Sequence, residues 1–97
     1  MIRRIKTMDI LPDYELLVAF DDGRVVLYDV KEDIRTMPGF AELSNGLFQN
    51  AQLDESRTCI FWTPEIDLPS DAIYEYGIPV YGPILKVQKD MGLKNET

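Results

Sequence analysis

The chain has 97 residues, of which 45% are hydrophobic, and this is enough for one buried core but too little for two ordinary domains. Its formal net charge of −7 comes from an acidic middle, because fifteen carboxylate residues and only four basic ones lie between Asp9 and Leu85. Nucleic-acid affinity depends on cationic side chains that displace counterions, so this balance disfavours direct nucleic-acid binding.

Three β-strands are expected in the first third of the chain. Residues 2–8 are β-compatible and precede the breaker Pro12-Asp13, which predicts a first strand. Residues 14–20 and 24–30 are rich in aliphatic, β-branched and aromatic side chains. Because a short polar turn separates these two segments, they predict a β-hairpin.

The hairpin turn is expected at Asp21-Asp22-Gly23. Glycine accepts a positive φ without a Cβ clash, and aspartate tolerates the left-handed region better than most residues. We therefore assign Asp21, Asp22 and Gly23 a structural role in this turn. Alternation along the strands places Leu16, Val18 and Phe20 on one face of the hairpin. They share this face with Val26 and Tyr28 or with the cross-strand neighbours of those two residues.

The remainder of the chain predicts short helices and a second hairpin. A short helix is expected over residues 38–43, and Ser44-Asn45-Gly46 ends it. Residues 47–53 and 57–63 are expected to pair around the polar turn Asp54-Glu55-Ser56. A capped helical turn is expected over residues 72–76, after Ser70-Asp71. Further on, residues 84–88 are compatible with a strand or latch, and residues 89–97 with a frayed end.

These elements predict an α+β fold. Its centre is a small antiparallel β-sheet of two hairpins plus an N-terminal strand, and one or two short helices accompany the sheet. Residues 1–76 are expected to form a single α+β domain. Residues 77–97 are expected to form a C-terminal extension that is partly ordered at most.

Residue types that are absent exclude several kinds of catalytic site. The chain contains no histidine and one cysteine, Cys59, so it cannot form an intrachain disulfide, a Ser-His-Asp or Cys-His site, or a His/Cys zinc site. Cys59 lies in a predicted strand, where a free cysteine usually acts as a small buried apolar residue. Turn and capping roles explain Asp22 and Asp71. We therefore predict no catalytic residue, no metal ligand and no cofactor.

The lengths of the apolar stretches and the pattern of the first residues indicate the compartment in which the protein is expected. The longest purely apolar stretches are only a few residues, and the first residues lack the pattern of a secretory signal. We expect a cytoplasmic protein without a membrane-spanning segment, and a single cysteine is consistent with that compartment.

Aromatic residues near the end of the expected core are candidates for binding. Trp62 and Tyr74 belong either to an exposed patch or to the core, where small domains commonly bury their aromatic side chains. Trp62, Asp67 and Tyr74 are the candidate interaction residues.

Several short motifs occur in a definite order: Phe20-Asp21-Asp22-Gly23-Arg24, Tyr28-Asp29-Val30, Leu47-Phe48, Ile60-x-Trp62, Ile66-Asp67-Leu68 and Ile73-Tyr74. Over residues 2–76 this order resembles the DUF2442 family of small bacterial proteins. The family pattern has a glycine before the Asp-Leu pair, where this chain has Ile66, so Pro64-Glu65 must supply the turn. The resemblance implies a compact α+β fold with an antiparallel sheet and an occasional association with toxin–antitoxin-like gene pairs. It implies no established activity and transfers no functional residue.

Three functional classes remain open. An acidic body, missing catalytic groups and an open strand edge favour a non-catalytic protein-interaction or regulatory module that binds another protein or itself. A nucleic-acid-associated regulator would require the basic termini to gather on one face: Arg3, Arg4, Lys6, Lys86, Lys89 and Lys94. A carboxylate-based enzyme would require a pocket with at least three converging carboxylates, or one with a strongly shifted pKa.

Overall fold

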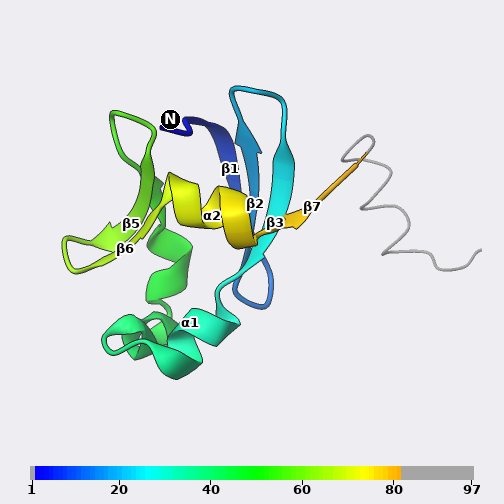
Figure 1. Cartoon of the computed structure of the whole chain (residues 1–97). Coiled ribbons are helices and arrows are strands. Elements are labelled where there is room, and N and C mark those ends of the chain that lie inside the picture. Colours follow the sequence, from blue (N-terminus) through cyan, green and yellow to red (C-terminus); the bar gives the residue numbers. More distant parts are fainter. Residues whose placement is uncertain (1, 82–97) are drawn as a thin grey trace, which may run out of the picture.

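Two antiparallel β-sheets organise residues 2–81, the part of the chain that the computed structural model describes (Figure 1). The four-stranded sheet has the order β1-β2-β3-β7 and contains β1 (Ile5–Leu11), β2 (Glu15–Phe20), β3 (Val25–Asp29) and β7 (Ile78–Pro79). The three-stranded sheet contains β4 (Gln52–Leu53), β5 (Cys59–Thr63) and β6 (Ile66–Pro69). The helical segments are α1 (Lys31–Thr36), the 3-10 turns η1 (Phe40–Asn45) and η2 (Leu47–Asn50), and α2 (Ser70–Tyr76). The expected α+β class is confirmed.

The hairpin between β2 and β3 turns where the sequence predicts. Gly23 has a φ of 95°, and its N–H donates to the carbonyl of Phe20 at 2.9 Å. The carboxylate of Asp22 accepts the backbone N–H of Arg24 at 2.9 Å, as expected of an aspartate in a turn. Leu16 pairs with Tyr28 in the register of this hairpin. The predicted face is therefore the one that points into the core.

Strand β1 begins and ends three residues later than expected. Residues 2–4 precede it, and Ile5–Leu11 pairs with β2 along most of its length. The side chains of Met8 and Ile10 pack against the core, whereas Asp9 between them is exposed. This alternation continues the strand up to Pro12, which lacks the N–H needed for further pairing.

The expected strand over residues 47–53 is largely wrong, because only Gln52 and Leu53 are extended. Residues 47–50 form the 3-10 turn η2, which directs Phe48 into the core with 2% of its surface exposed. The helix expected over residues 38–43 is the 3-10 turn η1, and Gly46 ends it with a φ of 92°. Local apolar content alone did not distinguish a strand from a tight helical turn here.

Two elements were not expected. Helix α1 buries none of its residues completely, so it lacks the apolar periodicity that identifies a helix in a sequence. Strand β6 alternates buried Ile66 and Leu68 with exposed Asp67 and Pro69, a period of two within four residues. Pro64 before this strand and Pro69 at its end made the segment resemble a loop.

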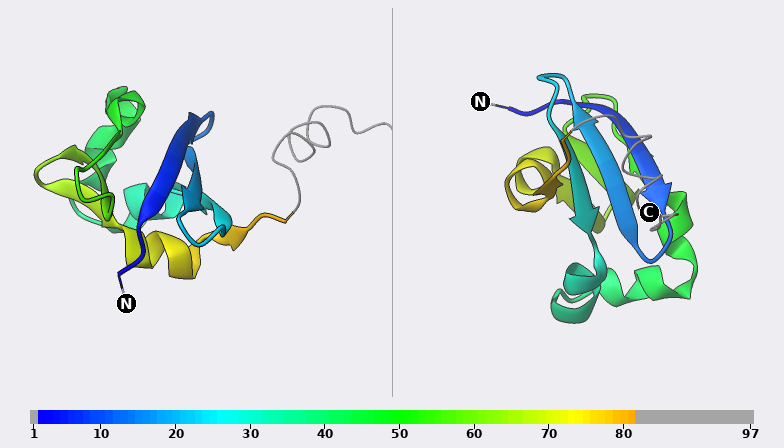
Figure 2. Two further views of the ribbon diagram at one scale, coloured as in Figure 1. Left: turned by 90° about the horizontal axis from the view of Figure 1, so that it is seen from above. Right: turned by 90° about the vertical axis from the view of Figure 1, so that its right-hand side faces the viewer.

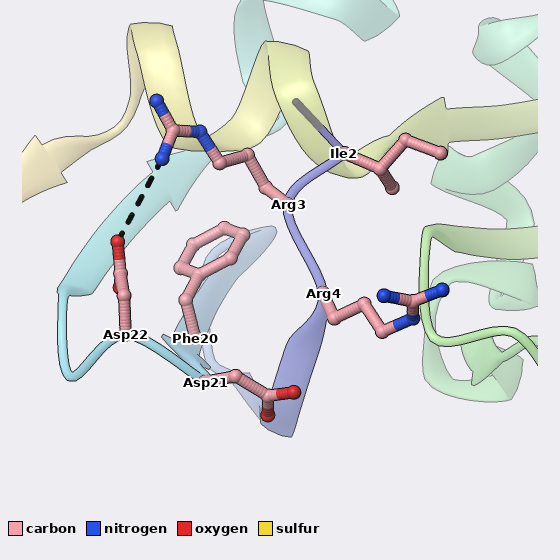
Figure 3. A pocket seen from close by; sticks show the side chains of 6 residues that line it. All are labelled: Ile2, Arg3, Arg4, Phe20, Asp21 and Asp22. Carbon is pink, nitrogen blue, oxygen red and sulfur yellow. Dashed lines mark ion pairs between the residues drawn. The ribbon is translucent and has the colours of Figure 1, made fainter.

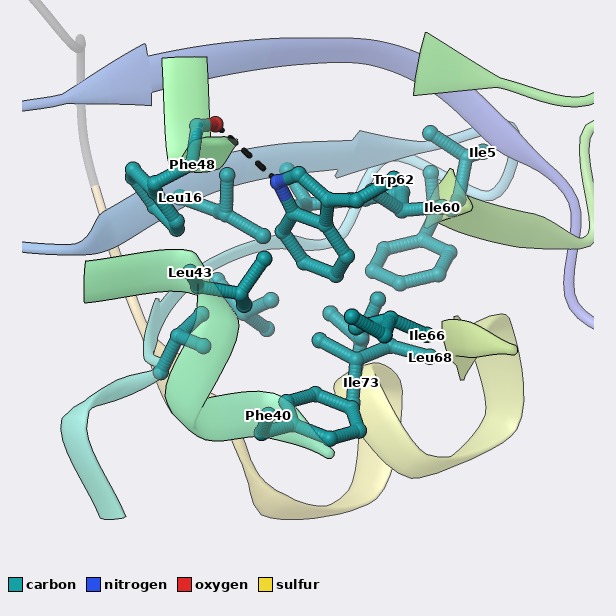
Figure 4. Packing of buried hydrophobic residues seen from close by; sticks show 14 residues of the cluster. Ile5, Leu16, Phe40, Leu43, Phe48, Ile60, Trp62, Ile66, Leu68 and Ile73 are labelled. Carbon is teal, nitrogen blue, oxygen red and sulfur yellow. Dashed lines mark hydrogen bonds between the residues drawn. The ribbon is translucent and has the colours of Figure 1, made fainter. Parts of the chain in front are cut away.

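The core lies between the two sheets and is closed by α2 and the 3-10 turns (Figure 2, Figure 4). Trp62 on β5 is 6% exposed, and its indole N–H donates to the carbonyl of Phe48 at 3.0 Å. The aromatic rings of Phe48 and Trp62 stack with their centroids 5.8 Å apart. Phe40 meets Trp62 edge-on at 6.3 Å, so η1 and η2 are fixed to the second sheet by aromatic contacts.

Helix α2 returns the chain to the four-stranded sheet. Neither Ser70 nor Asp71 caps this helix; the Ser70 hydroxyl donates to the carbonyl of Arg3, and Asp71 accepts the Arg3 backbone N–H at 3.4 Å. Gly77 follows the helix at a site where an added Cβ would lie 2.7 Å from the Ile73 carbonyl oxygen and 2.8 Å from the Val26 side chain. Only glycine permits this close approach between α2 and β3.

The first residues of the expected extension belong to the four-stranded sheet. Ile78 and Pro79 form β7 beside β3, and the Val80 N–H donates to the Val25 carbonyl at 2.8 Å. The strand or latch expected over residues 84–88 lies outside the described residues. Within residues 2–81, no helix is long and apolar enough to cross a membrane.

Candidate functional site

The hairpin turn and α2 bring Asp22 and Tyr74 together from distant parts of the chain. The Tyr74 hydroxyl donates to the Asp22 carboxylate at 2.8 Å, across 52 residues of sequence. The Tyr74 ring also meets Phe20 edge-on, with centroids 5.0 Å apart. Phe20 is buried, so this contact fixes the half-buried tyrosine ring at the surface of the core.

Two arginines stack on the Tyr74 ring. The guanidinium carbons of Arg3 and Arg24 lie 4.1 Å and 4.6 Å from the ring centroid. Arg3 also approaches Asp22 at 3.9 Å (Figure 3). Cation–π attraction holds both guanidinium groups over the ring, and we call Arg3, Arg24, Tyr74 and Asp22 the arginine–tyrosine cluster.

A third arginine connects the hairpin turn to the second sheet. The Arg57 guanidinium donates to both carboxylate oxygens of Asp21, at 2.8 Å and 2.9 Å, and to the Ile5 carbonyl at 3.1 Å. Its backbone carbonyl accepts the Ile5 N–H at 2.7 Å. Arg57 adopts a φ of 63°, which is unfavourable outside glycine, so these contacts hold it in place.

Hydrogen bonds keep both turn carboxylates ionised. The hydrogen bonds from Arg57 lower the pKa of Asp21 below its ordinary value. The backbone N–H of Arg24, and then the Tyr74 hydroxyl, lower the pKa of Asp22. Negative charge is therefore fixed at the turn at neutral pH.

Most basic residues of the described chain gather around these two carboxylates. We call this group the basic pole, and it contains five of the seven basic residues in 2–81: Arg3, Arg4, Lys6, Arg24 and Arg57. Two surface hollows lie within it. One of about 160 Å³ is lined by Arg3, Arg4 and the turn, and one of about 340 Å³ is lined by Arg24, Tyr74 and Tyr81 among others.

A third hollow lies at the opposite end of β3. Its volume is about 360 Å³, and we call it the acidic hollow; it is lined by Leu27, Tyr28, Asp29, Glu32, Asp33, Tyr76 and Ile78. Tyr76 is 76% exposed and Ile78 is 64% exposed, both large values for apolar side chains. The Tyr28 hydroxyl donates to Asp33 at 2.8 Å. Burial raises the pKa of both Tyr28 and Asp33.

The candidate residues from the sequence have different surroundings. Tyr74 joins Asp22 in the arginine–tyrosine cluster, Trp62 lies in the core, and Asp67 is exposed on β6. Sequence reasoning missed Arg3 and Arg24 as partners of Tyr74. No local pattern connects these three positions, because only the fold brings them together.

Metal and thiol chemistry have little support in the described chain. Within residues 2–81, no three His, Cys, Asp or Glu side chains are grouped so that they could hold a metal ion. Cys59 is partly buried, and burial raises the pKa of its thiol. Less of the reactive thiolate therefore forms at neutral pH.

Fold and surface together define a small two-sheet α+β domain with a basic pole at one end of its hairpin and an acidic hollow at the other. The chain belongs to the DUF2442 family, described as proteins of unknown function, and the family match covers residues 5–79. This match extends from β1 to β7 and confirms the resemblance. No curated protein and no solved structure matches the chain.

Proposed function

We propose that this chain is a non-catalytic protein-interaction module that binds a partner segment carrying basic and apolar side chains. The observation that carries this proposal is the exposure of Tyr76 and Ile78 in a hollow lined by three carboxylate residues. Exposed apolar groups beside fixed charges are typical of protein interfaces.

The energetics of burial support the acidic hollow as a docking site. Fully burying one large apolar side chain contributes about 1.5–3 kcal/mol, and both Tyr76 and Ile78 have most of their surface available. Ile78 also belongs to β7, which lies at one edge of the four-stranded sheet. A lysine or arginine in the partner would complement Asp33, which has no ion pair within residues 2–81, and would compete with Lys31 for Asp29 and with Arg35 for Glu32.

The same carboxylates argue for binding rather than catalysis. Asp29 pairs with Lys31 at 3.1 Å, Glu32 pairs with Arg35, and Asp33 accepts the Tyr28 hydroxyl. Each carboxylate thus has its own partner, and the three do not converge on one point. A carboxylate-based enzyme is therefore the least supported of the three classes.

Affinity capture with matched variants tests the proposal. Full-length wild-type protein and Ile78→Ser are used to capture partners from native-host extracts, and Met37→Ser, which alters an exposed methionine that does not line the hollow, is the control. We expect a partner that binds wild type and Met37→Ser but not Ile78→Ser. Hydrogen exchange on that partner should protect a segment rich in basic and apolar residues. Equal capture by all three proteins, or protection of an acidic segment, would refute the proposal.

Self-association is the nearest variant of this proposal. The carboxylates of one acidic hollow would repel those of a second copy, which favours a different protein as the partner. Light scattering of the isolated protein separates the two. A dimer that Ile78→Ser abolishes would make the partner a second copy.

A nucleic-acid-associated role is the second candidate, and the basic pole is the observation that favours it. Arg3, Arg4 and Lys6 lie near Asp21 and Asp22, as their effects on those carboxylates show. The carboxylates oppose phosphate binding at the same place, so we rank this role lower. Duplex DNA binding that weakens steeply with salt and is lost in Arg3→Gln would reverse the ranking.

A further inference from the structure

The outer face of the four-stranded sheet, which is turned away from the core, carries a second set of apolar side chains. The strand pairings place ten side chains on it in three cross-strand rows: Thr7-Ala19-Val25, Asp9-Leu17-Leu27-Ile78 and Leu11-Glu15-Asp29. Six of the ten are apolar, and none of these six belongs to the core or packs against it. The solvent side of an antiparallel sheet is usually polar, so this face has the composition of a covered surface.

No other element of residues 2–81 lies over the outer face. In the right-hand view of Figure 2 the sheet faces the viewer, and the described helices and the second sheet lie behind or beside it. Leu11, Val25 and Leu27 are each partly exposed. Ile78 is 64% exposed, whereas Leu17 in the middle row is 7% exposed. Covering the face would remove the remaining apolar surface from water, which is favourable.

The outer face is acidic at the end farthest from the β2–β3 turn. Asp9, Glu15 and Asp29 belong to its rows, and Asp13 lies in the turn that follows β1. Lys31 is the cation beside them, with its Nζ 3.1 Å from Asp13 and from Asp29 and 3.9 Å from Glu15. Asp9 forms no ion pair with any residue in 2–81. One ammonium among four carboxylates leaves three negative charges uncompensated.

The charges around this acidic end do not cancel the excess. Helix α1 adds Glu32, Asp33 and Arg35, and Arg35 pairs with Glu32. The basic pole lies at the opposite end of the strands, where its side chains surround the turn carboxylates. A segment that covers the outer face would therefore need apolar side chains together with positive charge at the acidic end.

Residues 84–89 have this composition, and the described chain ends close to the face. Their sequence is Ile-Leu-Lys-Val-Gln-Lys, with three apolar residues, two lysines and no carboxylate. The Val80 N–H donates to the Val25 carbonyl at 2.8 Å, so Tyr81 follows at the edge of the sheet. Between Tyr81 and this segment stands Gly82-Pro83, a dipeptide typical of turns.

The chain is also long enough to reach the acidic end. Val25 and Asp29 are four residues apart on β3, which corresponds to about 14 Å along the strand. Glu15 lies on the neighbouring strand, about 5 Å further across the sheet. Five residues span up to about 16–18 Å when extended, so Lys86 can reach both carboxylates from Tyr81.

We propose that residues 84–89 dock on the outer face of the four-stranded sheet of their own chain. Their apolar side chains cover Leu17 and Leu27, and their two lysines lie beside the carboxylates of the acidic end. A second copy of the sheet is a poorer cover, because the carboxylates of two such faces would repel each other. Leu27 and Ile78 also line the acidic hollow, so the docked segment would compete with a partner there. The docking does not depend on that partner, because it occurs in the isolated chain.

Methyl NMR of the full chain tests the contact directly. Nuclear Overhauser effects are measured on protein with labelled Ile, Leu and Val methyl groups. We expect cross-peaks between the methyl groups of Leu17 or Leu27 and those of residues 84–87. In a mixture of two differently labelled preparations, no such cross-peak should connect one copy with another. Missing cross-peaks within the chain, or cross-peaks between copies, would overturn the proposal.

A pair of leucine variants separates specific docking from general stickiness. Leu85→Ser removes one apolar contact, so the cross-peaks from Val87 to the sheet should be lost. Leu93→Ser changes the same residue type outside the segment and should leave these cross-peaks unchanged. Trp62 fluorescence confirms that both variants are folded, since this side chain reports on the core. Equal cross-peaks in the two variants would count against the docking of residues 84–89.

Charge reversal tests the role of the carboxylates. Replacing Lys86 and Lys89 together by glutamate places negative charge beside the acidic end, so the cross-peaks from Val87 should weaken by about threefold or more. Lys94→Glu is the control, because it reverses a lysine outside the segment and should have a smaller effect. If Lys94→Glu weakens the cross-peaks as strongly as the double variant does, the proposed contact between these lysines and the carboxylates is wrong.

Discussion

Replacing Gly77 by alanine tests whether close contact, rather than backbone conformation, requires glycine after α2. Gly77 has a φ of −70°, which alanine adopts easily. The added Cβ would nevertheless lie 2.8 Å from the Val26 side chain, well inside the usual carbon–carbon separation of about 3.5–4.0 Å. Val26 is fully buried, so it cannot move away without disturbing the core.

The expected cost follows from overpacking. Inserting a methyl group into a closed core destabilises a protein by about 1–3 kcal/mol, and the lower entropy of unfolded alanine recovers about 0.4–1 kcal/mol. We expect Gly77→Ala to lower the free energy of unfolding by about 1–2 kcal/mol. Urea denaturation followed by Trp62 fluorescence measures this change, because Trp62 is the only tryptophan and is buried.

A double-mutant cycle identifies the cause. Val26→Ala removes the Val26 Cγ2 methyl, one of the three atoms that the new Cβ would meet, and leaves the Val26 Cβ and the Ile73 carbonyl oxygen in place, so it should reduce the cost of Gly77→Ala in part, by at least about 0.5 kcal/mol. Gly46→Ala is the matched control, because Gly46 has a φ of 92° and open space around it. Its cost comes from the left-handed backbone and should not depend on Val26. A neutral Gly77→Ala, or additive effects with Val26→Ala, would refute the reasoning.

Three further changes test other contacts. Trp62→Phe removes the indole N–H from the Phe48 carbonyl, which keeps the longer hydrogen bond from the Ala51 N–H at 3.4 Å, and it should cost about 1–3 kcal/mol in urea denaturation followed by circular dichroism; an unchanged midpoint would contradict a role for the indole hydrogen bond. Because Arg57 lowers the pKa of Asp21, their contact stabilises the fold above the ordinary aspartate value of 3.8 and is lost as pH falls through the lower folded pKa. Arg57→Gln should therefore lose less stability on acidification from about pH 5 than wild type, and equal pH profiles would contradict the pairing. Cys59 should react with a disulfide reagent near neutral pH roughly tenfold or more slowly in the native protein than in denaturant, and similar rates would show that the thiol is not protected.

Local chemistry made the first hairpin predictable. Asp22 and Gly23 form the turn with contacts only two or three residues away, so the sequence contains the whole signal. Strand β6 was missed because Pro64 and Pro69 resemble breakers, although Pro69 ends the strand and Pro64 precedes it. Helix α1 buries no residue completely and therefore left no apolar period to detect.

The arginine–tyrosine cluster was predictable only in part. Tyr74 was a candidate and Asp22 was assigned to the turn, but their hydrogen bond depends on how α2 packs on β3. The charge pattern along the chain indicated an acidic middle, whereas the fold collects Arg24 and Arg57 from that middle beside the basic N-terminal residues. Charge distribution in space depends on strand pairing, which is non-local, and so sequence order does not reveal it.

The strands of the second sheet lie in the chain between β3 and β7, two neighbouring strands of the four-stranded sheet. The chain leaves the four-stranded sheet after β3, builds the second sheet, and returns through α2 to add β7 beside β3. Arg57 and Ser70, both outside the four-stranded sheet, bind the backbone of Ile5 and Arg3 at its start. The hydrophobic side chains of each sheet are therefore buried against the other sheet, and they become exposed if the other sheet opens. We therefore expect amides in β2 and β5 to exchange with solvent through one shared global opening, with residues 2–81 folding as a single unit.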